Sequence, residues 1–266
     1  MAISLPKVHQ EVSHILKKTD QIALKYFSGK IKAEFKSDLL ASIDIVTQAD
    51  KEIEAILKKT LKQKFPDIGF IGEETSLNAV KDYNWIVDPI DGTMNFAHKI
   101  PLFGTSVALW QANQPLYGII SLPTQNQTIH AIKNQGVFLN NKKIKPKASL
   151  PKTNFVVFSS AGKNKDRLRL LDKLLSIVPL PRGYGCTVFQ GVAAILKHAN
   201  AAIFVKNAIW DIAAILPIAQ EVGLHCQFIS PWPDIHGPDI RQYKQTLVIG
   251  QKTLVNQLVP KIKQVL

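Results

Sequence analysis

The chain has 266 residues, of which 46% are hydrophobic and 20% charged, so it is long and apolar enough to bury a sizeable core. This composition excludes a disordered chain, a collagen-like chain and a coiled coil. No apolar run approaches the roughly 18 residues that suggest a membrane span. The first residues lack the basic-then-apolar pattern of a secretion signal. With only two cysteines, Cys186 and Cys226, the sequence predicts a reduced, cytoplasmic protein.

The charge balance is strongly positive, because 33 basic and 20 acidic residues give a net charge of +13. Few of the basic residues are arginines, the residue type that reads guanine through paired hydrogen bonds, and the rest are lysines. A lysine excess favours a solvated surface, or a general attraction for anionic ligands, over a nucleic-acid footprint. Nucleic-acid binding stays open as an alternative.

The first half of the sequence predicts two helices followed by strands. Apolar residues at helical spacing predict helices over residues 8–26 and 49–63, and Pro66 ends the second region. Short apolar runs between turn residues predict the strands that follow. These strands cover residues 68–72, 85–88, 106–110, 116–122 and 127–132, and a hairpin-like turn follows at 136–142.

The second half mixes strands and helices. Strands are predicted over residues 154–159 and 201–205. Helices are predicted over residues 166–177, 191–198, 211–222 and 254–266, although Pro260 weakens the last of them. The pattern predicts an α+β or layered α/β/α protein. We expect two halves, an α+β half at residues 1–150 and an α/β half at 151–266.

Acidic residues cluster in one short stretch of this basic chain. The cluster consists of Glu73, Glu74, Asp82, Asp88 and Asp91. After it, no acid occurs until residue 166. A solvated loop with helix caps would explain such a cluster. A site for a hard divalent cation would explain it too, because such ions take oxygen ligands.

The segment Trp-Ile-Val-Asp-Pro-Ile-Asp-Gly-Thr that ends at Thr93 favours the cation site. An apolar strand ends in Asp88, and Pro89 fixes φ and removes a ladder donor, so the strand is predicted to stop there. Asp91 follows in the turn, where its carboxylate can converge with that of Asp88 on one ion. Gly92 and Thr93 are predicted to open a helix whose free N–H groups would bind a phosphate.

Three motifs together point to a known family. They are Ile-Gly-Glu-Glu ending at Glu74, Trp-Ile-Val-Asp-Pro-Ile-Asp-Gly-Thr-Met-Asn-Phe ending at Phe96, and Trp-Asp-Ile-Ala-Ala ending at Ala214. The sequence thereby resembles the inositol monophosphatase family, the Mg²⁺-dependent, lithium-sensitive phosphatases of small molecules. The resemblance implies an α/β/α/β/α sandwich, and a homodimer that hydrolyses a small phosphorylated metabolite with metal-activated water.

The resemblance also implies roles for individual residues, with two or three Mg²⁺ ions in the site. The implied metal ligands are Glu73, Asp88, the carbonyl of Ile90, Asp91 and Asp211. Glu73 and Thr93 would orient and deprotonate the attacking water, and a third, weaker ion would lie near Glu73 and Asp50. Asp50 and Asp211 also suit simpler roles, as an exposed helix acid and as a helix N-cap. The implied phosphate and substrate contacts are Asp91, Gly92, Thr93, Gly185 and Cys186.

The second half departs from the family pattern. Inositol-specific members commonly carry an acid seven positions before the last motif aspartate, and Phe204 stands there in this chain. Metal chemistry is expected to survive this change, whereas inositol preference is not. Lys206 and Arg182 could bind a second anion of the substrate, so a 3′(2′),5′-bisphosphate nucleotidase or a sugar bisphosphatase are alternatives. A basic nucleic-acid-binding or regulatory protein that retains the phosphatase fold is an alternative from another class.

Overall fold

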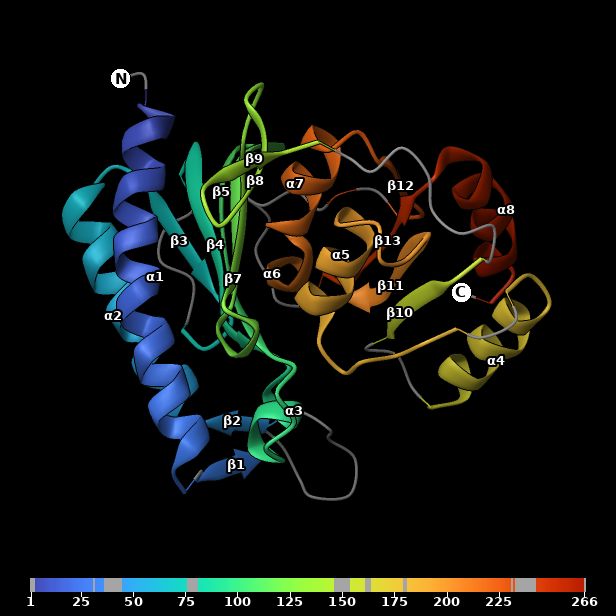
Figure 1. Cartoon of the computed structure of the whole chain (residues 1–266), viewed down its shortest axis with the longest axis horizontal. Helices are drawn as coiled ribbons and strands as arrows, with labels where there is room; N and C mark the ends of the chain where they lie inside the picture. The colour runs from blue at the N-terminus through green and yellow to red at the C-terminus, as the bar shows by residue number, and fades with distance from the viewer. Residues whose placement is uncertain are drawn as a thin grey trace.

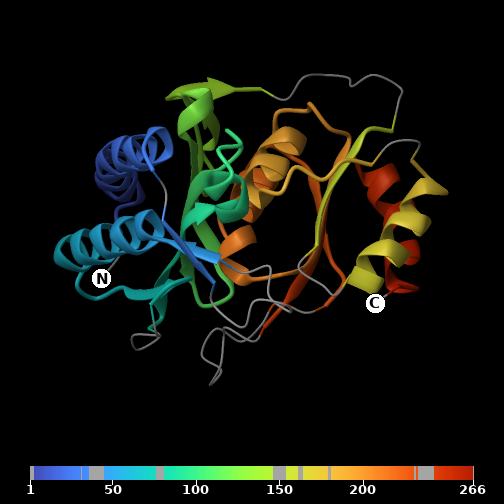
Figure 2. The ribbon, with the colours of Figure 1, turned by 90° about the horizontal axis from the view of Figure 1, so that it is seen from below.

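The computed structural model describes residues 3–30, 32–35, 45–75, 81–145, 154–160, 164–178, 181–230, 232 and 243–265. Within these residues, helices and sheets alternate in five layers (Figure 1). Two long helices cover one face of a large sheet, and three short helices lie between this sheet and a smaller one. Two further helices cover the outer face of the smaller sheet (Figure 2). The α/β/α/β/α sandwich that the family resemblance implies is confirmed.

The outer helices α1 (Leu5–Ser28) and α2 (Gln48–Lys64) are those that the apolar spacing predicts, and each buries one apolar face. A capping box begins α2, because the side chains of Thr47 and Asp50 each accept a hydrogen bond from the other residue's backbone N–H. A short antiparallel hairpin of β1 (Ala33–Phe35) and β2 (Ile45–Thr47) precedes α2, and the sequence does not predict it.

The larger sheet has seven strands in the order β3-β4-β5-β6-β7-β8-β9. The first two strands run parallel, and each later strand pairs antiparallel with its neighbour. The predicted meander and hairpin are thereby confirmed. The strands are β3 (Gly69–Gly72), β4 (Tyr83–Asp91), β5 (Gly104–Gln111), β6 (Gln114–Leu122), β7 (Gln127–Ile132), β8 (Gly136–Leu139) and β9 (Lys142–Ile144).

Strand β4 does not stop before Pro89, so that prediction is wrong. The strand continues to Asp91 through a bulge, because Asp88 pairs with Ser106 whereas Asp91 pairs with Gly104. Three positions of β4 are thus matched by two positions of β5. Side chains three residues apart on a regular strand point to opposite faces. The bulge therefore allows Asp88 and Asp91 to share one side of the sheet.

The smaller sheet has four strands in the order β10-β11-β13-β12. Strands β10 (Val156–Ser160) and β11 (Ala201–Asn207) run parallel and agree with the predicted strands. Strand β13 (Gln245–Gly250) pairs antiparallel with β11 and with β12 (His225–Phe228). The sequence analysis missed both of these last strands, although every residue of β13 is buried.

Helices fill the space between the sheets and cover the smaller sheet (Figure 2). The middle layer holds α5 (Thr187–Ile195), α6 (Ile209–Ile212) and α7 (Ile215–Glu221), and the outer layer holds α4 (Asn164–Leu175) and α8 (Lys252–Lys263). The single helix predicted over 211–222 is therefore two helices. Pro260 lies inside α8 on an exposed position and does not end the helix. Among the helices described, none is both long and apolar enough to cross a membrane.

The largest apolar core joins both sheets through the middle helices. It includes Ile71 and Trp110 of the larger sheet together with Phe204 and Ile249 of the smaller one. Phe204 has no exposed surface, so the expectation that its ring occupies a polyol-binding position is wrong. The division near residue 150 falls outside the described residues and stays a prediction.

Candidate metal centre and active site

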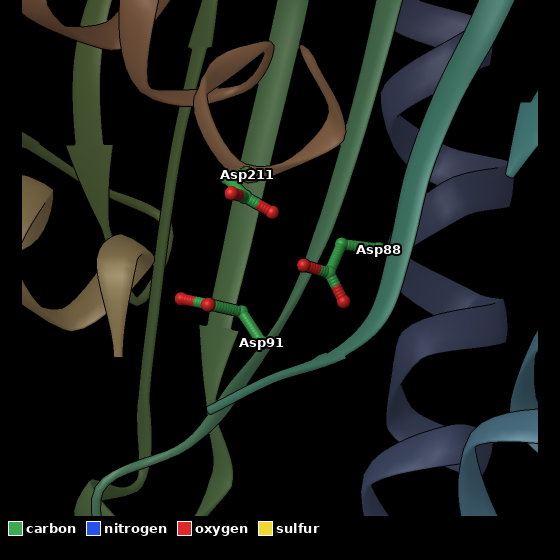
Figure 3. A group of neighbouring side chains, drawn as sticks. All are labelled: Asp88, Asp91 and Asp211. Atoms are coloured by element: carbon green, nitrogen blue, oxygen red, sulfur yellow. The ribbon is translucent and has the colours of Figure 1, made fainter. Parts of the chain in front are cut away.

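Three aspartates from two distant parts of the chain meet between the larger sheet and the middle helices. Asp88 and Asp91 lie on β4, and Asp211 lies on α6. One carboxylate oxygen from each residue lies within 4.8 Å of the other two. Figure 3 shows the three side chains around one space. The structure thus brings together three of the residues that the sequence identifies as metal ligands.

Asp88 is almost completely buried at 1% exposure. Burial raises the pKa of this carboxyl well above its usual range, and the charges of Glu73, Asp91 and Asp211 raise it further. Glu73, which directly follows β3, also hydrogen-bonds the Asp88 side chain. The group therefore resists full ionisation unless a positive charge joins it.

Asp91 has two hydrogen-bond donors on its Oδ2 atom. The backbone N–H of Val188, in the first turn of α5, donates one bond, and the Cys186 thiol donates the other with Sγ 3.2 Å away. Burial, and then the charge of Asp211, raises the pKa of Asp91 to about 7, although both donors oppose this rise. Burial also raises the pKa of the Cys186 thiol, which keeps it protonated and unsuited to act as a nucleophile.

Asp211 is held in place by donors at the end of β11. Its Oδ2 accepts hydrogen bonds from the Ala208 N–H at 3.1 Å and from Nδ2 of Asn207 at 2.9 Å. Asn207 also lies within hydrogen-bond distance of the hydroxyls of Ser159 and Thr187. Sequence reasoning missed Asn207, whose signal is a polar residue that closes an apolar strand four positions before Asp211.

The residues expected around the attacking water form a second group beside β4. The Thr93 hydroxyl oxygen lies 2.9 Å from the carbonyl oxygen of Ile90 and 3.3 Å from Oδ1 of Asp50. Asp50 has no exposed surface, so its interpretation as an exposed helix acid is wrong. Its Oδ2 accepts a hydrogen bond from the Thr47 N–H at 2.8 Å, so Asp50 joins the N-terminus of α2 to the motif at Thr93.

Two glycines allow the chain to pass close to these residues. Gly92 caps the short helix α3 (Thr93–Ala97) with φ of 87°, and a Cβ there would lie 2.9 Å from the Leu102 carbonyl oxygen. Gly185 has φ of 69°, and a Cβ there would lie 2.9 Å from Oδ1 of Asn95. Both positions therefore require glycine.

Asn95, which sequence reasoning also missed, links the motif at β4 to the predicted substrate loop. Its Nδ2 donates hydrogen bonds to the carbonyls of Leu102 at 2.9 Å and Tyr184 at 2.7 Å. The loop that carries Gly185 is therefore fixed against α3. Lys206 lies elsewhere, at the end of β11, where its backbone N–H donates to the Thr246 hydroxyl at 3.2 Å.

The donor set fits a hard divalent cation. All the side chains that converge are carboxylates, the ligands that Mg²⁺ and Ca²⁺ prefer. Oδ1 of Asp88 is buried and has no hydrogen-bond partner among the described residues, which leaves a lone pair for an ion. A bound cation would also offset the repulsion that raises the pKa values of Asp88 and Asp91.

Comparison with known proteins agrees with this geometry. A model of the inositol monophosphatase family matches residues 7–262. Inositol monophosphatase 2 of Saccharomyces cerevisiae is 44% identical over 112 residues, which are 41% of this chain and 38% of the yeast protein. The histidinol-phosphatase of Chlorobaculum parvum is 30% identical over 217 residues, which are 80% of this chain and 82% of that protein.

Solved structures show the same fold. An IMPase/NADP phosphatase, solved as a complex with Mg²⁺ and phosphate, superposes with a TM-score of 0.80 at 21% identity. The superposition covers 97% of this chain and 95% of that one. With the family match over nearly the whole chain and the three motif aspartates gathered at one point, the chain belongs to the inositol monophosphatase family of phosphoric monoester hydrolases.

Proposed function

We propose that this chain hydrolyses small phosphate monoesters by attack of water in a Mg²⁺-dependent reaction. The observation that carries the proposal is the convergence of Asp88, Asp91 and Asp211 on one space, with a buried oxygen of Asp88 left without a partner among the described residues. The complex of a structural relative with Mg²⁺ and phosphate supports the choice of ion. Five mutually repelling acids would serve little purpose in a protein that only binds nucleic acid.

Two or three ions are proposed for the site, as the family resemblance implies. Asp88, Asp91 and Asp211 are placed to hold one ion, and Glu73, Asp88 and the Ile90 carbonyl to hold a second. A third, weaker position lies near Glu73 and Asp50. When bound, the ions supply charge that stabilises the attacking and leaving oxygens of the phosphoryl group. Lithium is expected to inhibit by occupying one of these positions.

The protein groups orient the water and remove its proton. Thr93, whose hydroxyl is fixed between Ile90 and Asp50, holds the water, and Glu73 accepts its proton. The backbone N–H groups of Gly92 and Thr93 hold the phosphate oxygens, since free N–H groups at the start of a helix favour anions. These fixed donors act where charge spreads over three phosphoryl oxygens in the transition state.

The substrate is proposed to be a small phosphorylated metabolite, handled by a homodimer. Its leaving group would lie near Gly185 and Cys186, in the loop that Asn95 fixes against α3. Because Phe204 is in the core, it gives no reason to exclude polyols. Lys206 is half-buried at the end of β11, and bisphosphorylated substrates would gain if its ammonium group enters the site.

Phosphate release from a panel of substrates tests this proposal. The panel contains inositol 1-phosphate, histidinol phosphate, a nucleoside 3′,5′-bisphosphate and a sugar bisphosphate, each with Mg²⁺ and with excess EDTA. We expect release that requires Mg²⁺ and is abolished in Asp88→Asn. Asp82→Asn is the matched control, because Asp82 is an exposed acid that only accepts a hydrogen bond from Gln111 at 3.0 Å. Full activity in EDTA would contradict the proposal.

A further inference from the structure

Glu54 is a buried acid to which the proposed reaction gives no role. It lies on α2 with no exposed surface, between the buried apolar residues Ile53 and Leu57. It follows Asp50 by four positions, so both side chains lie on the same face of the helix. Burying a carboxylate is costly unless hydrogen bonds compensate it, so its partners indicate its purpose.

The partners of Glu54 are two consecutive backbone amides in the segment that carries Glu73. Oε2 of Glu54 accepts a hydrogen bond from the N–H of Glu74 at 2.8 Å, and Oε1 accepts one from the N–H of Thr75 at 2.7 Å. Each oxygen thus binds one donor, and hydrogen bonds to an ionised group are among the stronger ones. The carboxylate grips the chain immediately after Glu73.

Gly72, on the other side of Glu73, provides the space that this carboxylate occupies. A Cβ at Gly72 would lie 2.6 Å from Cδ of Glu54 and 2.7 Å from each of its oxygens. Gly72 is a strand residue and is not among the residues with positive φ, so its backbone suits any amino acid. The glycine is therefore required for space, and the space is filled by Glu54.

We propose that Glu54 is a positioning residue, which fixes the segment after β3 so that the Glu73 side chain meets Asp88 and the metal. The inference rests on the proposed function, in which Glu73 and Asp88 hold an ion. Without Glu54, the N–H groups of Glu74 and Thr75 lose their printed acceptor and the turn is free to move. Residues that orient metal ligands in this way typically contribute about 10–100-fold to metal affinity.

Mg²⁺ titration by calorimetry tests the inference without relying on turnover. In Glu54→Gln, an NH₂ group replaces one oxygen and opposes one of the two backbone N–H groups. We expect Mg²⁺ to bind about 10–100-fold more weakly than in the wild type. Glu52→Gln is the matched control, since Glu52 is exposed on the same helix and accepts a hydrogen bond from Tyr26 at 2.7 Å. It should bind Mg²⁺ as the wild type does.

Gly72→Ala supplies a second, independent variant. Its methyl group displaces the Glu54 carboxylate without changing any charge, so it should weaken Mg²⁺ binding as Glu54→Gln does. In a Glu54→Ala background the same change meets no carboxylate and should cause little additional loss. Residues that act through one contact give such non-additive effects, so the double-mutant cycle isolates this pair.

The outcomes separate this inference from the function on which it rests. Thermal melting of the metal-free proteins measures stability by itself. Normal Mg²⁺ binding by Glu54→Gln and Gly72→Ala, whether or not their melting temperatures fall, would show that Glu54 is merely structural. Absence of Mg²⁺ binding by the wild type would instead overturn the proposed function. If Glu54→Gln does not fold, Gly72→Ala and its cycle decide the question.

Discussion

Asp88 combines the deepest burial with the strongest repulsion in the acidic group, which makes it unfavourable in the metal-free protein. We predict that Asp88→Asn raises the melting temperature of the metal-free enzyme, because it removes one of several like charges that raise the pKa of Asp88. The same variant should lose the stabilisation that Mg²⁺ gives to the wild type. Melting curves with and without Mg²⁺ measure both effects. A lower melting temperature of the metal-free variant would contradict this account.

Asp91 gives the metal-free enzyme a distinct pH dependence. Its pKa of about 7 in the folded state exceeds the ordinary value of 3.8, so folding favours the protonated form. The resulting stabilisation is complete below about pH 4 and is lost as the pH rises to about 7. Wild type should therefore lose stability relative to Asp91→Asn between those pH values. Denaturant unfolding of both proteins tests this difference, which cancels the opposite contribution of His130, whose pKa is lowered to about 3.

The sequence predicts the motif acids well because they lie in short local patterns. Glu54, Asn95 and Asn207 escape prediction because their partners are brought close only by tertiary folding. Phe204 is misplaced for a definite reason. The pairing of β11 with β13 shifts between Phe204 and Asn207, and this irregularity changes the alternation of side chains. Counting back from Asp211 therefore does not identify the residue that faces the site.

Among the elements, the long helices and the strand meander follow from apolar periodicity, whereas strands in irregular surroundings do not. The bulge in β4 overrides the usual effect of a proline, since Pro89 sits where the ladder is already interrupted. Strand β13 is only six residues long and buried throughout, so it has no alternation to reveal it. The break between α6 and α7 is equally hidden, because both helices are apolar on nearly every position.

The contact between β6 and α7 determines how closely the middle helices approach the larger sheet. A Cβ at Gly118 would lie 2.6 Å from the carbonyl oxygen of Ala214, a backbone atom that cannot give way. Gly118→Ala should therefore destabilise the protein by about 1–3 kcal/mol, as overpacking of a core does. Gly183→Ala is the control, because the nearest atom to its Cβ would be 3.4 Å away. Urea unfolding compares the two, and equal stability would contradict this packing argument.

At the scale of the whole molecule, the net charge of +13 surrounds an acidic metal centre. Anionic substrates should be attracted over distances comparable to the Debye length, which shrinks as salt is added. We predict that kcat/KM falls several-fold between about 20 mM and about 200 mM salt, whereas kcat stays nearly constant. Steady-state kinetics at fixed Mg²⁺ measure this. A kcat that falls in parallel would point to loss of the metal rather than weaker attraction.

The placement of Asp211 across the layer boundary from Asp88 and Asp91 has a consequence for synthesis of the chain. While the ribosome is still making the second sheet, the β4 acids lack their third partner. They then remain protonated or exposed to water, and the nascent chain has little affinity for the ion. Only when α6 docks against the larger sheet is the set complete. In the proposed enzyme, acquisition of the metal therefore marks the end of folding, and prematurely terminated chains stay inactive.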